Sequence, residues 1–257
     1  MKAARAVAAC LLWTAMLLGW GAEAVAQRNV VWHKGGIVRG DTTRRRITLV
    51  FTADSYADGA DDVLRALREE RAKGAFFLTG RFVLRFPQVV RRLVDEGHYV
   101  GTHSHAHLLY FPWNSPEMLV SRSEFETDIR RAYEQLEPYG ISMKKAPFFV
   151  PPYEHYNDTV SAWAAGMGLV LMNYTPGTTS NADYTTPSMK NYRSSQTIYD
   201  NILALENRQG LNGHLMLFHL GTAAERTDKF YRRHLKELLQ ELKKRGYRFN
   251  DLRKGKI

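Results

Sequence analysis

Short runs of apolar and β-branched residues alternate with helical stretches along most of this chain. Residues 47–52 read Ile-Thr-Leu-Val-Phe-Thr without a charge, which is typical of a strand buried on both faces in a parallel sheet. Further runs of this kind predict strands at 75–78, 99–100, 147–150, 169–172, 214–219 and 247–249.

Between these runs, apolar residues recur three or four positions apart, as on one face of a helix. Helices are predicted at 59–71, 86–96, 123–139, 157–165, 194–206 and 229–245. Strand and helix alternate without a repeat or a linker, so we expect one α/β domain with a parallel sheet.

One long segment, 173–193, has no periodicity and is rich in Thr, Ser, Asn, Pro and Tyr. Loops of this length in compact domains are usually functional. We therefore expect this segment to form a lid or a wall of a substrate site.

The N-terminus has the pattern of an export signal. Lys2 and Arg5 precede an apolar run at 6–20, and Ala24-Val25-Ala26 offers small residues for cleavage. We predict a signal peptide at 1–26, a domain at 27–257, no stable membrane insertion after cleavage, and a secreted or periplasmic protein. The alternative is an uncleaved anchor helix.

Cysteine content and net charge limit the kinds of site and of binding partner that this protein can have. Cys10 is the only cysteine and would be removed with the signal, which excludes disulfides, cysteine-zinc sites and cysteine nucleophiles. The net charge is +10. For an exported protein this charge favours an anionic envelope glycan over nucleic acid as the partner.

Titratable residues gather where the predicted strands end. Asp54 follows the first strand, His103 and His107 follow the third, Glu154 follows 147–150, and His219 ends 214–219. Carboxyl ends of separate strands commonly form one active site. On a helical turn, histidines four apart share a face. One carboxylate and two imidazoles would give a three-ligand metal site with open positions.

The order of these motifs resembles the polysaccharide deacetylases of carbohydrate esterase family 4, the NodB-type domain. The most specific pieces are His-Ser-His-Ala-His at 103–107, Ala-Phe-Phe-Leu-Thr-Gly at 75–80 and Leu-Phe-His at 217–219. The resemblance runs from about residue 47 to the C-terminus and marks a divergent member of the family.

The resemblance implies a single domain with a deformed (β/α)7-type barrel of parallel strands. It also implies a divalent metal, with zinc expected and cobalt, nickel or iron as alternatives. Asp54, His103 and His107 match the metal ligands, and His219 matches the general acid. The backbone N–H of Tyr153 matches the donor to the oxyanion. The implied reaction removes an N- or O-acetyl group from a polysaccharide or envelope glycan, with metal-bound water as the nucleophile.

Three positions depart from the family pattern. Ala53 stands where the family has its aspartate base, and Val150 stands where an arginine would orient that base. Asn173 stands near the position of an aspartate that tunes the acid histidine.

Another group must then supply the base. Glu154 is the first candidate because it follows Pro-Pro-Tyr at a strand end, and Asp58 is the second. A third route uses His219 as base and then as acid. His105 lies between the two ligands and is expected off their shared face.

Aromatic residues in the same loops are candidates for sugar contact, best for Trp113. We expect an acetylated glycan as the partner of a deacetylase. The alternative is a carbohydrate-binding protein on a catalytically lapsed scaffold, which the missing base favours. A non-haem iron oxygenase also uses two histidines and a carboxylate, but its usual scaffold is all-β.

Overall fold

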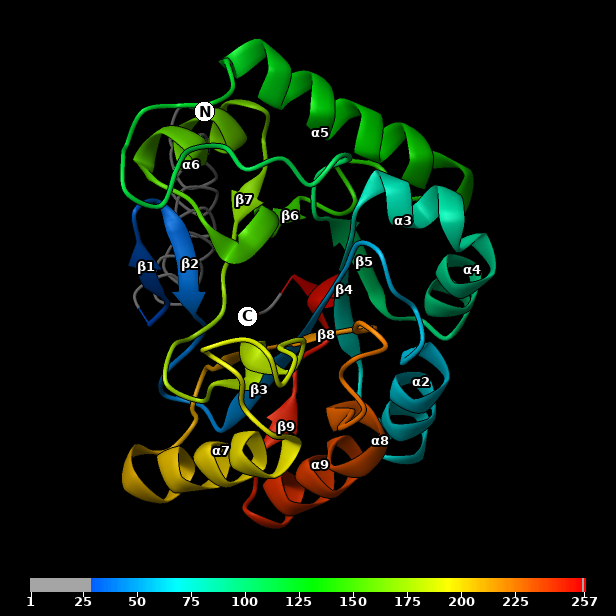
Figure 1. Ribbon diagram of the computed structural model, residues 1–257, viewed down its shortest axis with the longest axis vertical. Coiled ribbons are helices and arrows are strands. Elements are labelled where there is room, and N and C mark those ends of the chain that lie inside the picture. The colour runs from blue at the N-terminus through cyan, green and yellow to red at the C-terminus, as the bar shows by residue number, and fades with distance from the viewer. Residues whose placement is uncertain (1–28, 256) are drawn as a thin grey trace, which may run out of the picture.

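The computed structural model describes residues 29–255 and 257, and its centre is a curled sheet of seven parallel strands (Figure 1). The strands in chain order are β3 (Arg46–Ala53), β4 (Gly74–Leu78), β5 (Tyr99–Thr102), β6 (Phe148–Phe149), β7 (Val170–Leu171), β8 (Leu215–His219) and β9 (Arg248–Phe249). Their order in space is β7-β6-β5-β4-β3-β8, and β9 pairs with the start of β3. The predicted α/β domain with parallel strands is confirmed.

The two edges of the curled sheet are brought together by the chain that follows β7. Thr175 donates its backbone N–H to the carbonyl of Leu215, and its hydroxyl accepts the N–H of Leu215 at 2.9 Å. Beside β7 lies an antiparallel pair, β1 (Val31–His33) and β2 (Gly36–Arg39), in which Ile37 forms a bridge to Met172. The sheet therefore closes on itself through a loop and not through a continuous strand ladder.

Helices cover the outer face of the sheet (Figure 1). They are α2 (Ala60–Glu69), α3 (Gly80–Arg85), α4 (Pro87–Asp95), α5 (Arg122–Leu136), α6 (Asp158–Gly166), α7 (Ser195–Gln209), α8 (Phe230–Arg233) and α9 (Leu235–Lys244). Short 3₁₀ turns are formed by η1 (Glu137–Tyr139), η2 (Pro152–Glu154), η3 (Ser180–Ala182) and η4 (Leu252–Lys254).

Both faces of the central strands are buried because side chains alternate along a strand. Leu49 and Phe51 of β3 join the large apolar cluster under the helices. Val50, between them, joins a smaller cluster inside the curl, together with Phe77 and Leu217. This two-sided burial is the physical reason that the strands read as continuous apolar runs.

Two helices differ from the sequence prediction. No helix is predicted between the strand at 75–78 and the helix at 86–96, but α3 lies there, and Thr79 caps it by accepting the N–H of Phe82 at 3.0 Å. The helix predicted at 229–245 is two helices, because the backbone leaves helical geometry at His234 (φ −120°, ψ −18°). The helical spacing of apolar residues continues across His234, so periodicity does not predict the break there.

Nothing in the described part of the chain forms a helix with the length and apolar character needed to cross a bilayer. The predicted signal peptide at 1–26 lies outside the described residues.

Candidate active site

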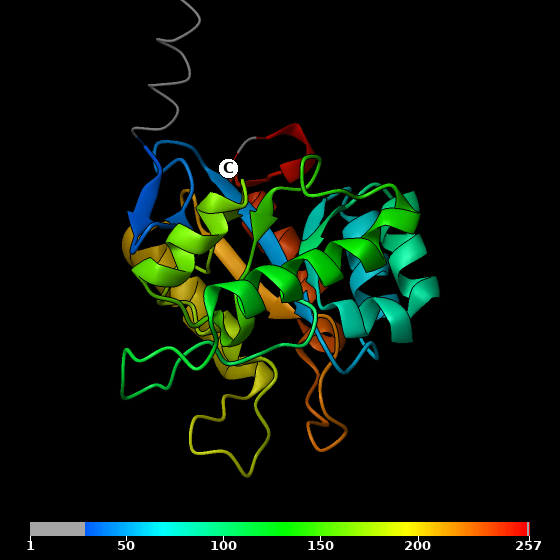
Figure 2. The same ribbon diagram turned by 90° about the horizontal axis from the view of Figure 1, so that it is seen from above.

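A cavity of about 450 Å³ opens at the carboxyl ends of β3, β5 and β8. Three loops project around this end of the sheet: green before α5, yellow before α7 and orange before α8 (Figure 2). Every site residue predicted from the sequence lines the cavity: Asp54, His103, His107, Trp113, Tyr153, Glu154 and His219.

The two histidines of the His-x-x-x-His motif converge in this cavity. Their Nε2 atoms are 3.2 Å apart. His103 Nδ1 lies 2.7 Å from the carbonyl of Val150, which can only accept, so Nδ1 carries the proton and Nε2 keeps its lone pair. Burial lowers the pKa of His107 to about 4, and burial together with His107 lowers that of His103. Both imidazoles are therefore neutral near pH 7.

The predicted helical turn at 103–107 is wrong. These residues form a loop in which Ser104 (φ 71°) and His107 (φ 55°) have left-handed backbone geometry. The hydroxyl of Ser104 accepts the N–H of His107 at 3.1 Å, and the Ser104 N–H donates to the Thr102 hydroxyl at 3.0 Å. Local turns, and not a helix, bring the imidazole rings of His103 and His107 together.

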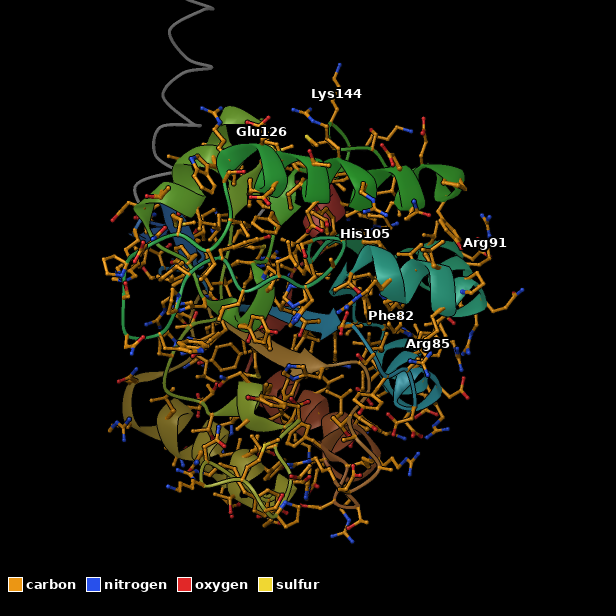
Figure 3. All side chains as sticks on the ribbon, turned by 45° about the horizontal axis from the view of Figure 1, so that its top comes forward. Phe82, Arg85, Arg91, His105, Glu126 and Lys144 are labelled. Atoms are coloured by element: carbon orange, nitrogen blue, oxygen red, sulfur yellow. The ribbon has the colours of Figure 1, made fainter. Side chains whose placement is uncertain are left out.

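His105 points away from the pair, as expected. It lies between α3 and α5 (Figure 3), and its N–H donates to the carboxylate of Asp128 at 3.0 Å. Gly80 leaves the space for its ring, since a Cβ there would meet His105 Nδ1 at 2.1 Å. His105 thus fastens the histidine loop to the two helices that cover it.

Asp54 is held by an arginine that the sequence analysis did not single out. Arg81 donates to Asp54 Oδ1 at 2.9 Å and Oδ2 at 3.1 Å, Thr79 donates to Oδ1, and Ser55 donates to Oδ2. Burial acts to raise the pKa of Asp54, but these hydrogen bonds outweigh it and leave that pKa lowered. The Asp54 carboxylate is therefore ionised, and both of its oxygens already accept hydrogen bonds from side chains.

The side chains of His103, His107 and Asp54 are of the chemical types that bind a divalent metal. Two nitrogen ligands about 2.0–2.1 Å from a tetrahedral zinc lie about 3.3 Å apart, close to the 3.2 Å between His103 Nε2 and His107 Nε2. Asp54 lines the same cavity. As placed, however, no three acidic, imidazole or thiol side chains within residues 29–255 are close enough to hold a metal. The Asp54 carboxylate would have to be shared with, or released by, Arg81.

His219 has a carboxylate partner that sequence reasoning missed. Asp183 Oδ1 lies 2.6 Å from His219 Nδ1, and Oδ2 accepts the backbone N–H of His219 at 2.9 Å. Burial acts to lower the pKa of His219, but the Asp183 carboxylate outweighs it and leaves that pKa raised. The partner comes from the aperiodic 173–193 segment and not from the strand before Asn173.

The two carboxylates considered as the base have different environments. Glu154 lines the cavity, and burial raises its pKa to about 7, aided by Asp183 and opposed by His219. Asp58 is engaged elsewhere: it accepts the N–H of Thr222, and its pKa is lowered. Geometry thus favours Glu154 over Asp58.

Asn173 still serves this corner of the site. Its side-chain amide donates to the carbonyl of Glu154 at 2.7 Å. Both Tyr153 (φ 59°) and Glu154 (φ 53°) have left-handed backbone geometry, so this bond supports a tightly turned segment.

Exposed aromatic rings form the rim of the cavity. Trp113 is 68% exposed and lies against His155 with ring centroids 3.9 Å apart, and Phe111 stacks on the same imidazole at 4.0 Å. Tyr153 lies against the ring of His107, with centroids 4.4 Å apart, and Tyr184 lies 4.8 Å from His219. Such surfaces can stack on sugar rings.

Comparisons with known proteins identify the family of the chain. The family model of polysaccharide deacetylases matches residues 39–172. A peptidoglycan-N-acetylglucosamine deacetylase of Bacillus cereus is 30% identical over 204 residues, covering 77% of this chain and 84% of that protein.

Solved structures share the fold. The family 4 carbohydrate esterase PdaA of Bacillus subtilis has a TM-score of 0.65 at 23% identity, covering 84% of this chain and 82% of that one. A family 4 pseudoenzyme from Bacillus anthracis has a TM-score of 0.66 at 19% identity, covering 85% of this chain and 67% of that one. The expected deformed (β/α)7-type barrel is thereby confirmed.

Proposed function

Because this chain belongs to the polysaccharide deacetylase family, we propose that it is an exported, metal-dependent hydrolase that removes N- or O-acetyl groups from an envelope glycan. One observation carries the proposal: the neutral His103–His107 pair and the Asp183-bound His219 face the same cavity. Metal-assisted hydrolysis requires side chains that bind a metal and a proton donor close to them.

The side chains divide the reaction between them. His103, His107 and Asp54 would hold the metal, which would supply Lewis acidity to the hydrolysis. Glu154 takes the proton of the attacking water. His219 gives its proton to the leaving amine or alkoxide, with Asp183 orienting the imidazolium.

The remaining site residues bind substrate. The N–H of Tyr153 donates to the oxygen that becomes negative in the tetrahedral intermediate. Trp113 stacks on a sugar ring at the rim of the cavity. Peptidoglycan fragments are the first substrates to try, because relatives are named for that polymer.

Acetate release tests the proposal. The protein from Gln27 onward would be incubated with zinc and with peptidoglycan fragments, chitin oligomers or acetylated xylan. Acetate is expected from at least one of them, and its rate should fall in an Asp183→Asn variant. Zinc binding without acetate from any substrate would instead favour the second candidate, a glycan-binding protein on a lapsed scaffold.

That second candidate rests on specific positions. Ala53 and Val150 replace the base and its orienting arginine, and one structural neighbour is itself described as a pseudoenzyme. The buried Asp183 carboxylate argues against a binding protein. It is 1% exposed, and both of its oxygens bind His219. A binding protein has no use for this costly pair.

Replacing Arg81 with methionine is expected to tighten zinc binding by up to about fivefold. The change frees the Asp54 carboxylate from an ion pair with a half-exposed arginine, and such pairs contribute about 0.2–1 kcal/mol. Competition with a zinc-binding dye would measure the dissociation constant. Arg85→Met is the matched control, because Arg85 reaches the carbonyl of Ser55 and not Asp54. An unchanged constant in the Arg81 variant would contradict this assignment.

Replacing Trp113 with alanine is expected to raise KM for a glycan oligomer about threefold to tenfold, with a smaller effect on kcat. The reason is the loss of one stacked aromatic ring, worth about 0.5–1.5 kcal/mol. Trp32, 45% exposed on β1, is a matched control because it does not line the cavity. Equal changes in both variants would remove Trp113 from the binding site.

A further inference from the structure

Arg226, in the segment between β8 and α8, is a fully buried cation with 0% exposure. Its guanidinium donates through NH1 to the carbonyl of Thr185, and through NH2 to the carbonyl of Arg193 at 3.0 Å and to Ser195 Oγ at 3.3 Å. Its carbon Cζ lies 5.4 Å from the ring centre of Tyr192. Among the described residues, no carboxylate forms an ion pair with it.

The two carbonyl acceptors of Arg226, those of Thr185 and Arg193, are the two ends of one loop, residues 185–193. This loop lies in the yellow segment before α7. The orange segment between β8 and α8, to which Arg226 belongs, projects at the same end of the molecule (Figure 2). The planar fork of an arginine reaches the two carbonyls through two separate nitrogens, NH1 and NH2, whereas a lysine would have to reach both from a single nitrogen. A buried cation without a carboxylate depends on those carbonyls, so opening the loop would leave its charge without partners.

The first end of this loop is tied to the partner of His219. Thr185 donates to the carbonyl of Ala182 through its N–H at 3.0 Å and through its hydroxyl at 2.6 Å. Asp183 directly follows Ala182, and both of its carboxylate oxygens bind His219. A continuous set of hydrogen bonds therefore runs from Arg226 through Thr185 to the segment that presents Asp183.

We propose that Arg226 is a positioning residue for the general acid: by closing the 185–193 loop it fixes Asp183 against His219. The same closure sets Thr186 and Met189 in the wall of the cavity. The inference rests on the proposed function, because the placement of Asp183 matters to catalysis only if His219 acts as the acid.

Hydrogen exchange tests this placement without any substrate. Arg226→Met removes the fork at similar side-chain length, and amides of 183–193 together with that of His219 are expected to exchange about tenfold faster. Lys229→Met is the matched control. Lys229 is also buried in this segment, but its contacts are with Thr222, Ala223 and Asp58.

The control should lower Tm yet leave these amides protected. Retained protection in Arg226→Met, or equal loss in both variants, would overturn the proposal. If Arg226→Met does not fold, Arg226→Lys keeps the buried charge but replaces the two nitrogens that reach the two ends of the loop with one, and the same amides should still exchange faster.

A double-mutant cycle tests the catalytic consequence. Arg226→Met is expected to lower kcat by about tenfold or more, since small misplacements of catalytic groups have effects of this size. If Arg226 acts through Asp183, the double variant with Asp183→Asn should be no slower than Asp183→Asn alone, within about twofold. Additive losses would overturn the proposal. If the unaltered protein releases no acetate, the proposed function fails, and hydrogen exchange alone decides whether Arg226 fixes Asp183.

Discussion

Stripping the protein of divalent metal, or replacing Asp54 with alanine, is expected to lower acetate release by about 10³-fold or more. A metal contributes several kcal/mol of charge stabilisation to such reactions, and about 1.4 kcal/mol corresponds to a factor of ten. Asp54→Ala would leave only two of the three proposed ligands, His103 and His107, too few for a stable catalytic site. Acetate release would be measured after chelation and after reloading with zinc, cobalt, nickel or iron in turn.

Reloading should restore activity to the unaltered protein and not to Asp54→Ala. Asp61→Ala is the matched control, because Asp61 is a surface carboxylate of α2 whose partner is Arg92. Full activity in the metal-free protein would remove the metal from the mechanism. Full activity in the Asp54 variant would remove Asp54 from the ligand set.

The second large effect is expected from Glu154→Gln, which should lower kcat by about 10²-fold with little change in KM. Glutamine has nearly the same shape but cannot accept the proton of the attacking water, and general-base catalysis contributes about 10²–10⁴-fold. Steady-state kinetics on the best acetylated oligomer would measure this loss. Glu225→Gln is the control, because Glu225 is an exposed carboxylate that follows the cavity-lining residues 221–223 but does not itself line the cavity. A Glu154 variant within a few fold of the unaltered protein would move the role of base to His219.

The pH profile distinguishes these two assignments. Burial raises the pKa of Glu154 to about 7, and a base works only when ionised, so kcat/KM should increase as the pH rises through about 7. His219 works as an acid only when protonated, and Asp183 outweighs burial to raise its pKa, so kcat/KM should fall again at higher pH. Glu154→Gln should remove the rise and keep the fall. A rise that persists in that variant would assign it to another group.

Much of the site could be predicted from the sequence because strand ends impose their own geometry. Asp54, His103 and His219 each lie at or just after the end of a parallel strand, and parallel strands deliver their carboxyl ends to one edge. The buried strands themselves were readable as continuous apolar runs. Glu154 and Trp113 were placed at the cavity by the same reasoning applied to the loops that follow.

Other parts of the site depended on contacts between segments far apart in the chain. Asp183 is 36 residues from His219, in a segment without periodicity, so no pattern could say which of its side chains would be buried. The resemblance instead predicts an aspartate near Asn173. Arg81 on Asp54 and Arg226 on the 185–193 loop are likewise set by packing, since an arginine in a sequence gives no sign of its acceptors.

The sequence by itself determined the α/β class, the positions of most strands along the chain and the edge of the sheet where the titratable residues gather, because periodicity and strand polarity are local properties of the chain. Only the tertiary structure decided how the histidines converge, which carboxylate orients His219, and which cations hold Asp54 and the loop of Asp183. These three features depend on loop backbone geometry and on hydrogen bonds between distant segments. Neither of these produces a periodic pattern in the sequence from which it could be predicted.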